Sequence, residues 1–125
     1  MRKIIIAIGI SITVFFIACT TTKSNNSSAP KVSKSGIIPP TASQYDAIKG
    51  KYENVTMDEL NEGYKIYKGI CTDCHRAKNI YKRSDTKWPE IIRVMSKKAK
   101  ISDSEKEKLT KYIMSIKATQ PVPSK

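Results

Sequence analysis

Two cysteines and a histidine stand close together in the second half of the chain, in the order Cys71-Thr72-Asp73-Cys74-His75. Two thiols and an imidazole at this spacing suit four kinds of site: half of a zinc site, a redox-active dithiol, a structural disulfide, or the covalent attachment of haem. Each kind of site needs different partners elsewhere in the chain. The surrounding sequence therefore decides among them.

The rest of the chain argues against the first three kinds of site. A structural zinc site needs four ligands, and the chain has no other histidine and no further cysteine except Cys19. A thioredoxin-like dithiol belongs to a βαβ setting, whereas the sequence around the motif has a helical pattern. A disulfide between Cys71 and Cys74 closes a short loop, adds little stability, and leaves His75 without a role.

Covalent attachment of haem uses all three residues. Cys71 and Cys74 would form thioether bonds with the two vinyl groups, and His75, which follows directly, would bind the iron as the proximal ligand. Haem of this type is attached outside the bacterial cytoplasm, so this interpretation also requires an exported protein.

The N-terminus has the pattern of an export signal. Arg2 and Lys3 precede an apolar run from Ile4 to Ala18, which is short for a bilayer span and ends at Cys19. The stretch FIAC at residues 16–19 resembles the lipobox of bacterial lipoproteins. This resemblance implies a signal peptide over residues 1–18 and a lipid on Cys19, in the cell envelope and on the periplasmic side of a bacterial membrane. An ordinary signal peptide cut near Ala18 and an uncleaved anchor are the alternatives.

The remainder divides into a linker, one domain and a tail. Residues 19–50 are rich in Ser, Thr, Asn, Lys and Pro and predict a flexible linker, although Ile37 to Pro40 and Tyr45 to Ile48 are apolar enough to pack on the domain. Residues 51–120 form the domain, and residues 121–125 form the tail. A core of about 70 residues usually needs a disulfide, a metal or a large cofactor for stability.

The domain is predicted to be all-α, because no stretch alternates apolar and polar residues as a strand would. Thr56 with Glu59 and Ser102 with Glu105 have the form of capping boxes that begin a first and a third helix, and a second helix begins near Trp88, followed by proline. Apolar residues three or four apart give each helix an inner face: Met57, Leu60, Tyr64 and Tyr67, then Trp88, Ile91, Ile92 and Met95, then Leu109, Tyr112, Ile113 and Ile116.

Over residues 56–117 the chain resembles class I monohaem cytochromes c. Gly63 and Tyr67 stand eight and four residues before the motif, where that family has a glycine and an aromatic residue on its first helix. Leu109 and Tyr112 match the Leu-x-x-aromatic pair of its last helix. The resemblance implies a small cytochrome c fold with three main helices around one covalently bound haem, in which the first and last helices cross at the glycine.

One feature departs from that family. Many of its members have a proline shortly after the motif, whose carbonyl accepts the N–H of the proximal histidine, whereas the first proline after His75 is Pro89. Another backbone carbonyl is therefore expected to accept this bond. The sequence alone does not say which carbonyl it is.

The sixth iron ligand decides between two classes of protein. His75 is the only histidine, so a second imidazole of the same chain cannot bind the iron. Met95 shares the predicted inner face of Trp88, and the stretch that ends in Val94-Met95 resembles the one before the last helix of many short monohaem cytochromes. Met95 is therefore the expected distal ligand, whereas Met57 is expected to fill the core and Met114 to point away from it.

Histidine and methionine ligation suits outer-sphere electron transfer. The expected function is thus a membrane-tethered carrier of single electrons between exported or membrane-bound redox proteins, monomeric, with no enzymatic activity and no nucleic-acid partner. Alternatives are a haem protein with an open sixth site, peroxidase-like or gas-binding, and a structural lipoprotein whose two cysteines form a disulfide. The net charge of +12 suits acidic partners or an anionic surface, but a solvated lysine-rich surface is the simpler explanation.

Overall fold

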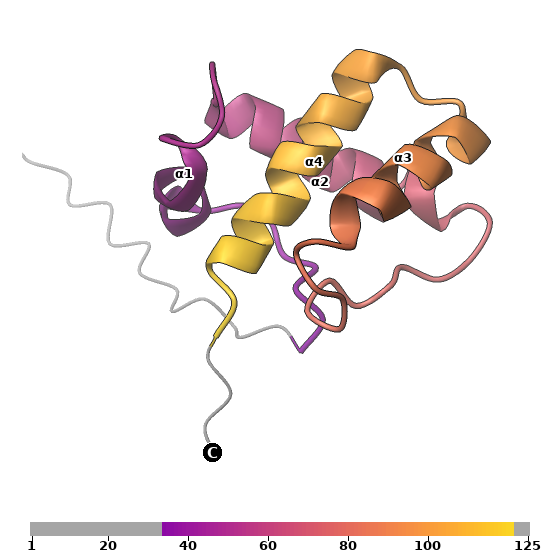
Figure 1. Ribbon diagram of the computed structural model, residues 1–125, viewed down its shortest axis with the longest axis horizontal. Coiled ribbons are helices and arrows are strands. Elements are labelled where there is room, and N and C mark those ends of the chain that lie inside the picture. Colours follow the sequence, from indigo (N-terminus) through magenta and orange to yellow (C-terminus); the bar gives the residue numbers. More distant parts are fainter. Residues whose placement is uncertain (1–33, 122–125) are drawn as a thin grey trace, which may run out of the picture.

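The computed structural model describes residues 34–121, which form four α-helices and one short 3-10 helix (Figure 1). The elements are α1 (Ala42–Ile48), α2 (Met57–Lys68), η1 (Ile70–Thr72), α3 (Trp88–Ala99) and α4 (Asp103–Ala118). These residues contain no strand, so the predicted all-α class is confirmed for this part of the chain. The predicted signal peptide and Cys19 lie outside the described residues.

The three predicted helices are confirmed as α2, α3 and α4. Thr56 accepts a hydrogen bond from the backbone N–H of Glu59 (3.1 Å), and the Glu59 carboxylate accepts one from the N–H of Thr56 (3.2 Å). Ser102 and Glu105 form the same reciprocal pair at the start of α4. Both boxes satisfy N–H groups that have no partner inside the first helical turn.

Helices α2 and α4 cross in close contact, with α1 and α3 on opposite sides of the crossing (Figure 1). A Cβ atom on Gly63 would lie 2.3 Å from the carbonyl oxygen of Lys108 and 2.7 Å from the Cβ of Tyr112. Only a residue without a side chain allows the two backbones to come this close. The predicted crossing at Gly63 is therefore confirmed.

A single apolar core fills the space around this crossing. Leu60, Ile80, Tyr112 and Ile116 are completely buried. Lys111 of α4 is also only 2 % exposed, and it pairs with Glu59 of α2 (3.1 Å) and with Glu107 (2.8 Å). Buried cations need such partners, so this ion pair adds a fixed contact between α2 and α4.

Residues 34–50 also pack on the helices, so the folded part begins before residue 51. Thr41 and Gln44 form a third capping box, which starts α1. Ile48 is 1 % exposed, and the Gln44 amide donates a hydrogen bond to Thr119 just after α4 (2.9 Å). The second half of the predicted linker contributes apolar surface that α4 covers, which is why it folds onto the domain.

Two methionines lie in other surroundings than the sequence suggested. Met114 is partly buried against the core instead of pointing away from it, while Met57 is partly exposed and outside the core cluster. Met114 packs against the same apolar cluster as Ile113 and Ile116, so more of the α4 surface is covered than its predicted inner face. No helix within residues 34–121 has the length and apolar character to cross a bilayer.

Candidate functional site

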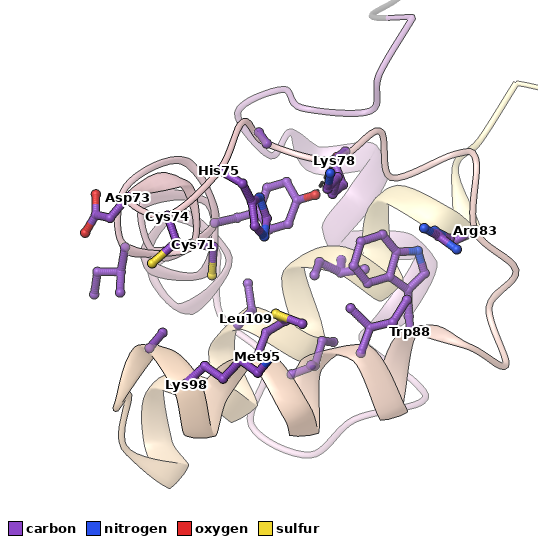
Figure 2. Close-up of a pocket in the computed structure, with 17 residues that line it drawn as sticks. Cys71, Asp73, Cys74, His75, Lys78, Arg83, Trp88, Met95, Lys98 and Leu109 are labelled. Carbon is purple, nitrogen blue, oxygen red and sulfur yellow. Dashed lines mark hydrogen bonds between the residues drawn. The ribbon is translucent and has the colours of Figure 1, made fainter.

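A cavity of about 610 Å³ opens between the end of α2, η1, the following loop, α3 and α4 (Figure 2). Its volume lies within the roughly 300–1,000 Å³ typical of small-molecule and cofactor sites. The walls are largely apolar and aromatic, as such sites usually are, and consist of Tyr67, Ile70, Ala77, Trp88, Ile91, Ile92, Ala99, Leu109 and Ile113.

The four residues that the sequence singled out in this part of the chain all line this one cavity: Cys71, Cys74, His75 and Met95. Figure 2 shows the motif on one side and Met95 on α3 at the other, with the side chains directed into the space between. Both cysteines are free thiols, Cys71 half-buried and Cys74 exposed. The fold thus brings a methionine next to a motif that is distant in sequence.

A tight turn presents the motif to the cavity. Helix α2 ends at Gly69, and η1 begins directly after it. The hydroxyl of Thr72 lies 2.8 Å from the carbonyl oxygens of both Lys68 and Gly69, and the Thr72 N–H donates to the Gly69 carbonyl (2.7 Å). These bonds satisfy carbonyls at the helix end that would otherwise have no partner. They fix the turn that carries Cys71 at the edge of the cavity.

The His75 ring is engaged through one nitrogen only. Its Nδ1 atom lies 2.9 Å from the carbonyl oxygen of Arg76. A carbonyl can only accept a hydrogen bond, so Nδ1 carries the proton and Nε2 keeps its lone pair. Arg76 therefore provides the carbonyl acceptor that the sequence left unassigned, and Nε2 is the atom that can bind a metal.

Met95 belongs to the face of α3 that the sequence predicted. Trp88, Ile91, Ile92 and Met95 all line the cavity. The indole N–H of Trp88 donates to the carbonyl of Ile80 (3.1 Å) and fixes the start of α3, while Trp88 itself is 2 % exposed. Met95 is half-buried, so its thioether, a soft and polarizable donor, faces the cavity.

Two polar groups in the cavity remain protonated at neutral pH. Burial, with a contribution from Asp73, raises the pKa of the Cys71 thiol. Burial, assisted by the nearby Cys71, raises the pKa of Tyr67 to about 12, and the Tyr67 hydroxyl donates to the carbonyl of Lys78. Reactive dithiol sites have the opposite property, a lowered cysteine pKa. The Cys71 environment therefore does not favour redox-dithiol chemistry.

The charged residues at the cavity are mostly basic. Lys78, Arg83 and Lys98 line it, against one carboxylate, Asp73. None of these three cations forms an ion pair within residues 34–121. In the same part of the chain no three His, Cys, Asp or Glu side chains are placed together to hold a metal ion.

Sequence reasoning missed several of these cavity residues. Lys98 and Ala99 follow Met95 by three and four positions, so helical spacing places them on the face of Met95 and could have identified them. Lys78 and Arg83 lie in a loop without periodicity. No sequence pattern indicates which residues of such a loop face a cavity.

No protein-family model, no curated protein and no solved structure matches this chain. What the protein does must therefore be inferred from the cavity and from the residues around it.

Proposed function

We propose that the cavity holds one haem, attached through thioether bonds from Cys71 and Cys74, and that the protein is an electron carrier. His75 and Met95 would bind the iron. The observation that carries the proposal is the position of Met95: it comes from a different helix than the motif, yet it lines the same cavity. If the motif were a chance match, there would be no reason to find a methionine sulfur on the other side of the same cavity.

The cavity residues fit such a group in three respects. Two free thiols lie at the same end of the cavity, as attachment through two vinyl groups requires. The His75 ring keeps Nε2 available because Nδ1 donates to the Arg76 carbonyl. A largely apolar lining of suitable volume lies between His75 and Met95. The Nδ1 bond is the kind of outer contact that orients metal-binding histidines.

When bound, haem would supply one-electron chemistry at its iron, and His75 with Met95 as ligands would give a higher reduction potential than a site without methionine. The chain's own residues then have separate tasks. The Arg76 carbonyl orients His75, and Met95 would hold the iron from α3 and so keep other ligands off it. The isoleucines of α3 and Leu109 exclude water from the cavity. Such a site transfers electrons without binding a substrate, so no enzymatic activity is proposed.

The partners and the location follow from the same proposal. Three basic residues at the cavity that form no ion pair within the described part of the chain, Lys78, Arg83 and Lys98, suit an acidic redox protein that approaches there. A lipid on Cys19 would keep the carrier at the periplasmic side of a bacterial membrane, close to exported or membrane-bound redox proteins. We propose that it acts there as a monomer.

The decisive experiment is mass spectrometry of the mature protein made in a host that attaches haem to exported proteins. We expect one haem per chain in the wild type and a pyridine haemochrome spectrum of haem bound by two thioethers. Cys71→Ser and Cys74→Ser should each lose one thioether, whereas Cys19→Ser is the matched control and should keep both. A wild-type chain that carries no haem in that host would overturn the proposal.

A further inference from the structure

One wall of the cavity is a loop with no secondary structure of its own to hold it. Residues 77–83 follow the motif and bring Ala77, Lys78 and Arg83 to the cavity. Figure 1 shows the beginning of the described chain, in indigo and purple, beside this loop. The two segments are far apart in sequence, and their contacts explain what fixes the loop.

Residues 34–36 contact the loop through backbone and side-chain bonds. The Asn79 amide donates to the carbonyl of Lys34 (2.7 Å), and the Ile80 N–H donates to the carbonyl of Ser35 (2.7 Å). Ile80 is completely buried. A buried N–H needs a partner, and for Ile80 that partner lies 45 residues earlier in the chain.

Gly36 completes this contact. Its φ is +73°, in the left-handed region, and a Cβ there would lie 3.0 Å from Ile116 Cγ2, 3.0 Å from Tyr81 Cε1 and 3.1 Å from Ile80 Cβ. Both the backbone conformation and the available space therefore require glycine. Residues 34–36 are thus in close van der Waals contact with the loop as well as hydrogen-bonded to it.

Backbone carbonyls of the same loop accept hydrogen bonds from two aromatic residues that line the cavity. The carbonyl of Ile80 accepts from the Trp88 indole, and the carbonyl of Lys78 accepts from the Tyr67 hydroxyl. A continuous set of hydrogen bonds thus runs from Ser35 through the backbone of Ile80 to Trp88. A shift of residues 34–36 therefore changes the position of the Ile80 carbonyl, and with it the partner of the Trp88 indole.

We infer that Lys34, Ser35 and Gly36 are positioning residues of the cavity: they clip the loop of residues 77–83 in place and thereby set the Trp88 wall. The inference goes beyond the proposed function and holds whether or not the cavity carries haem. Because the chain before Lys34 leads to Cys19, the clip also joins the cavity wall to the segment that comes from the predicted lipid anchor.

Two variants of the full chain test the clip. Asn79→Asp keeps the side-chain oxygen that accepts from the N–H groups of Tyr81 and Lys82 (2.9 and 3.3 Å) but loses the donor to the Lys34 carbonyl. Gly36→Val forces a branched side chain against Ile80 and Tyr81 of the loop and also against Ile116 of α4. Gly50→Val is the matched control, because a Cβ on Gly50 meets nothing within 4 Å.

The readout is amide and indole hydrogen exchange measured by NMR. Trp88 is the only tryptophan, so its indole N–H gives one assignable signal. We expect both variants to speed exchange of the Trp88 indole and of the Ile80 amide by about tenfold or more. In Asn79→Asp, which adds no bulk against α4, the central amides of α2 and α4 should be unchanged, as for a local opening. The Gly50→Val control should match the wild type.

Two results would overturn the clip. One is unchanged exchange at Ile80 and Trp88 in Asn79→Asp. The other is equal acceleration throughout α2 and α4 in Asn79→Asp, which would mean general loss of stability. If Gly36→Val fails to fold, Asn79→Asp still decides, because it adds no bulk. The measurement uses no property of haem, so its failure is distinct from failure of the electron-carrier proposal.

Discussion

Replacement of Gly63 by alanine gives the sharpest test of the helix crossing that positions the cavity. The new Cβ would lie 2.3 Å from the Lys108 carbonyl oxygen, whereas ordinary contacts of a Cβ begin at 3.4 Å, so α2 and α4 must separate locally by about 1 Å. In an uncrowded helix interior the same change stabilises by about 1 kcal/mol, because alanine is the better helix former. The close crossing therefore predicts that Gly63→Ala lowers the stability of the protein, whereas helix propensity alone predicts that it raises it.

The expected size follows from the packing. Overpacking of a well-packed interior typically costs about 1–3 kcal/mol, and a gap of 0.5–1 Å loses a quarter to a half of the dispersion energy of the contacts involved. After the gain in helix propensity, we expect a net loss on the order of 1–2 kcal/mol for Gly63→Ala. In a domain of this size that lowers the melting temperature by roughly 5–15 °C. Gly63→Val should lower it further.

Thermal unfolding of the full chain, followed by far-ultraviolet circular dichroism, measures this effect. All variants must be compared in the same haem-loading state, since a bound ligand adds its own stability. Gly50→Ala is the control and should change stability by no more than about 0.5 kcal/mol, as exposed substitutions do. If Gly63→Ala melts at or above the wild-type temperature, the close approach of α2 and α4 at this position is wrong.

Three further predictions concern the site, the anchor and pH. Met95→Ala should lower the reduction potential and allow the ferrous protein to bind carbon monoxide. Met57→Ala and Met114→Ala are the controls and should change neither property. A wild type that already binds carbon monoxide readily, with no effect of Met95→Ala, would instead favour an open sixth site. Cys19→Ala should release the protein from the membrane fraction, and unchanged membrane association together with unchanged gel mobility would rule out the lipid. The pKa of Tyr67 is raised from 10.0 to about 12 in the folded protein. As the pH rises, the unfolded chain therefore loses this proton first. The contribution of Tyr67 to stability is full below about pH 10 and is lost as the pH rises toward 12. Urea denaturation at several alkaline pH values should show this loss, reduced in Tyr67→Phe; stability that rises over that interval would contradict it.

The helices could be predicted because their signals are local. Each capping box of α2 and α4 lies within four consecutive residues, and Trp88-Pro89 marks the start of α3 in the same way. Helix α1 has an equally local signal in Thr41 and Gln44, but it has only 7 residues. Its stability comes from burial of Ile48 and from the bond to Thr119, which are tertiary contacts that no local pattern reveals.

The candidate site likewise has features that the local sequence predicts and features that depend on tertiary contacts. Cys71, Cys74 and His75 are adjacent in sequence, and helical spacing placed Met95 on the inner face of α3, so all four could be named in advance. The contact of His75 with the Arg76 carbonyl could not be predicted. The chain after His75 has no regular secondary structure, so the direction of that carbonyl depends on contacts with other parts of the chain.

Those contacts explain how a loop without proline can serve this site. Thirteen residues without proline separate His75 from Pro89. Three hydrogen bonds attach this loop to other parts of the chain: the Tyr67 hydroxyl donates to the Lys78 carbonyl, the Trp88 indole donates to the Ile80 carbonyl, and the Ile80 N–H donates to the Ser35 carbonyl. The first two come from helices that line the cavity and the third from the N-terminal segment. The path of the loop that follows His75 therefore depends on residues that a motif search around the cysteines would never include.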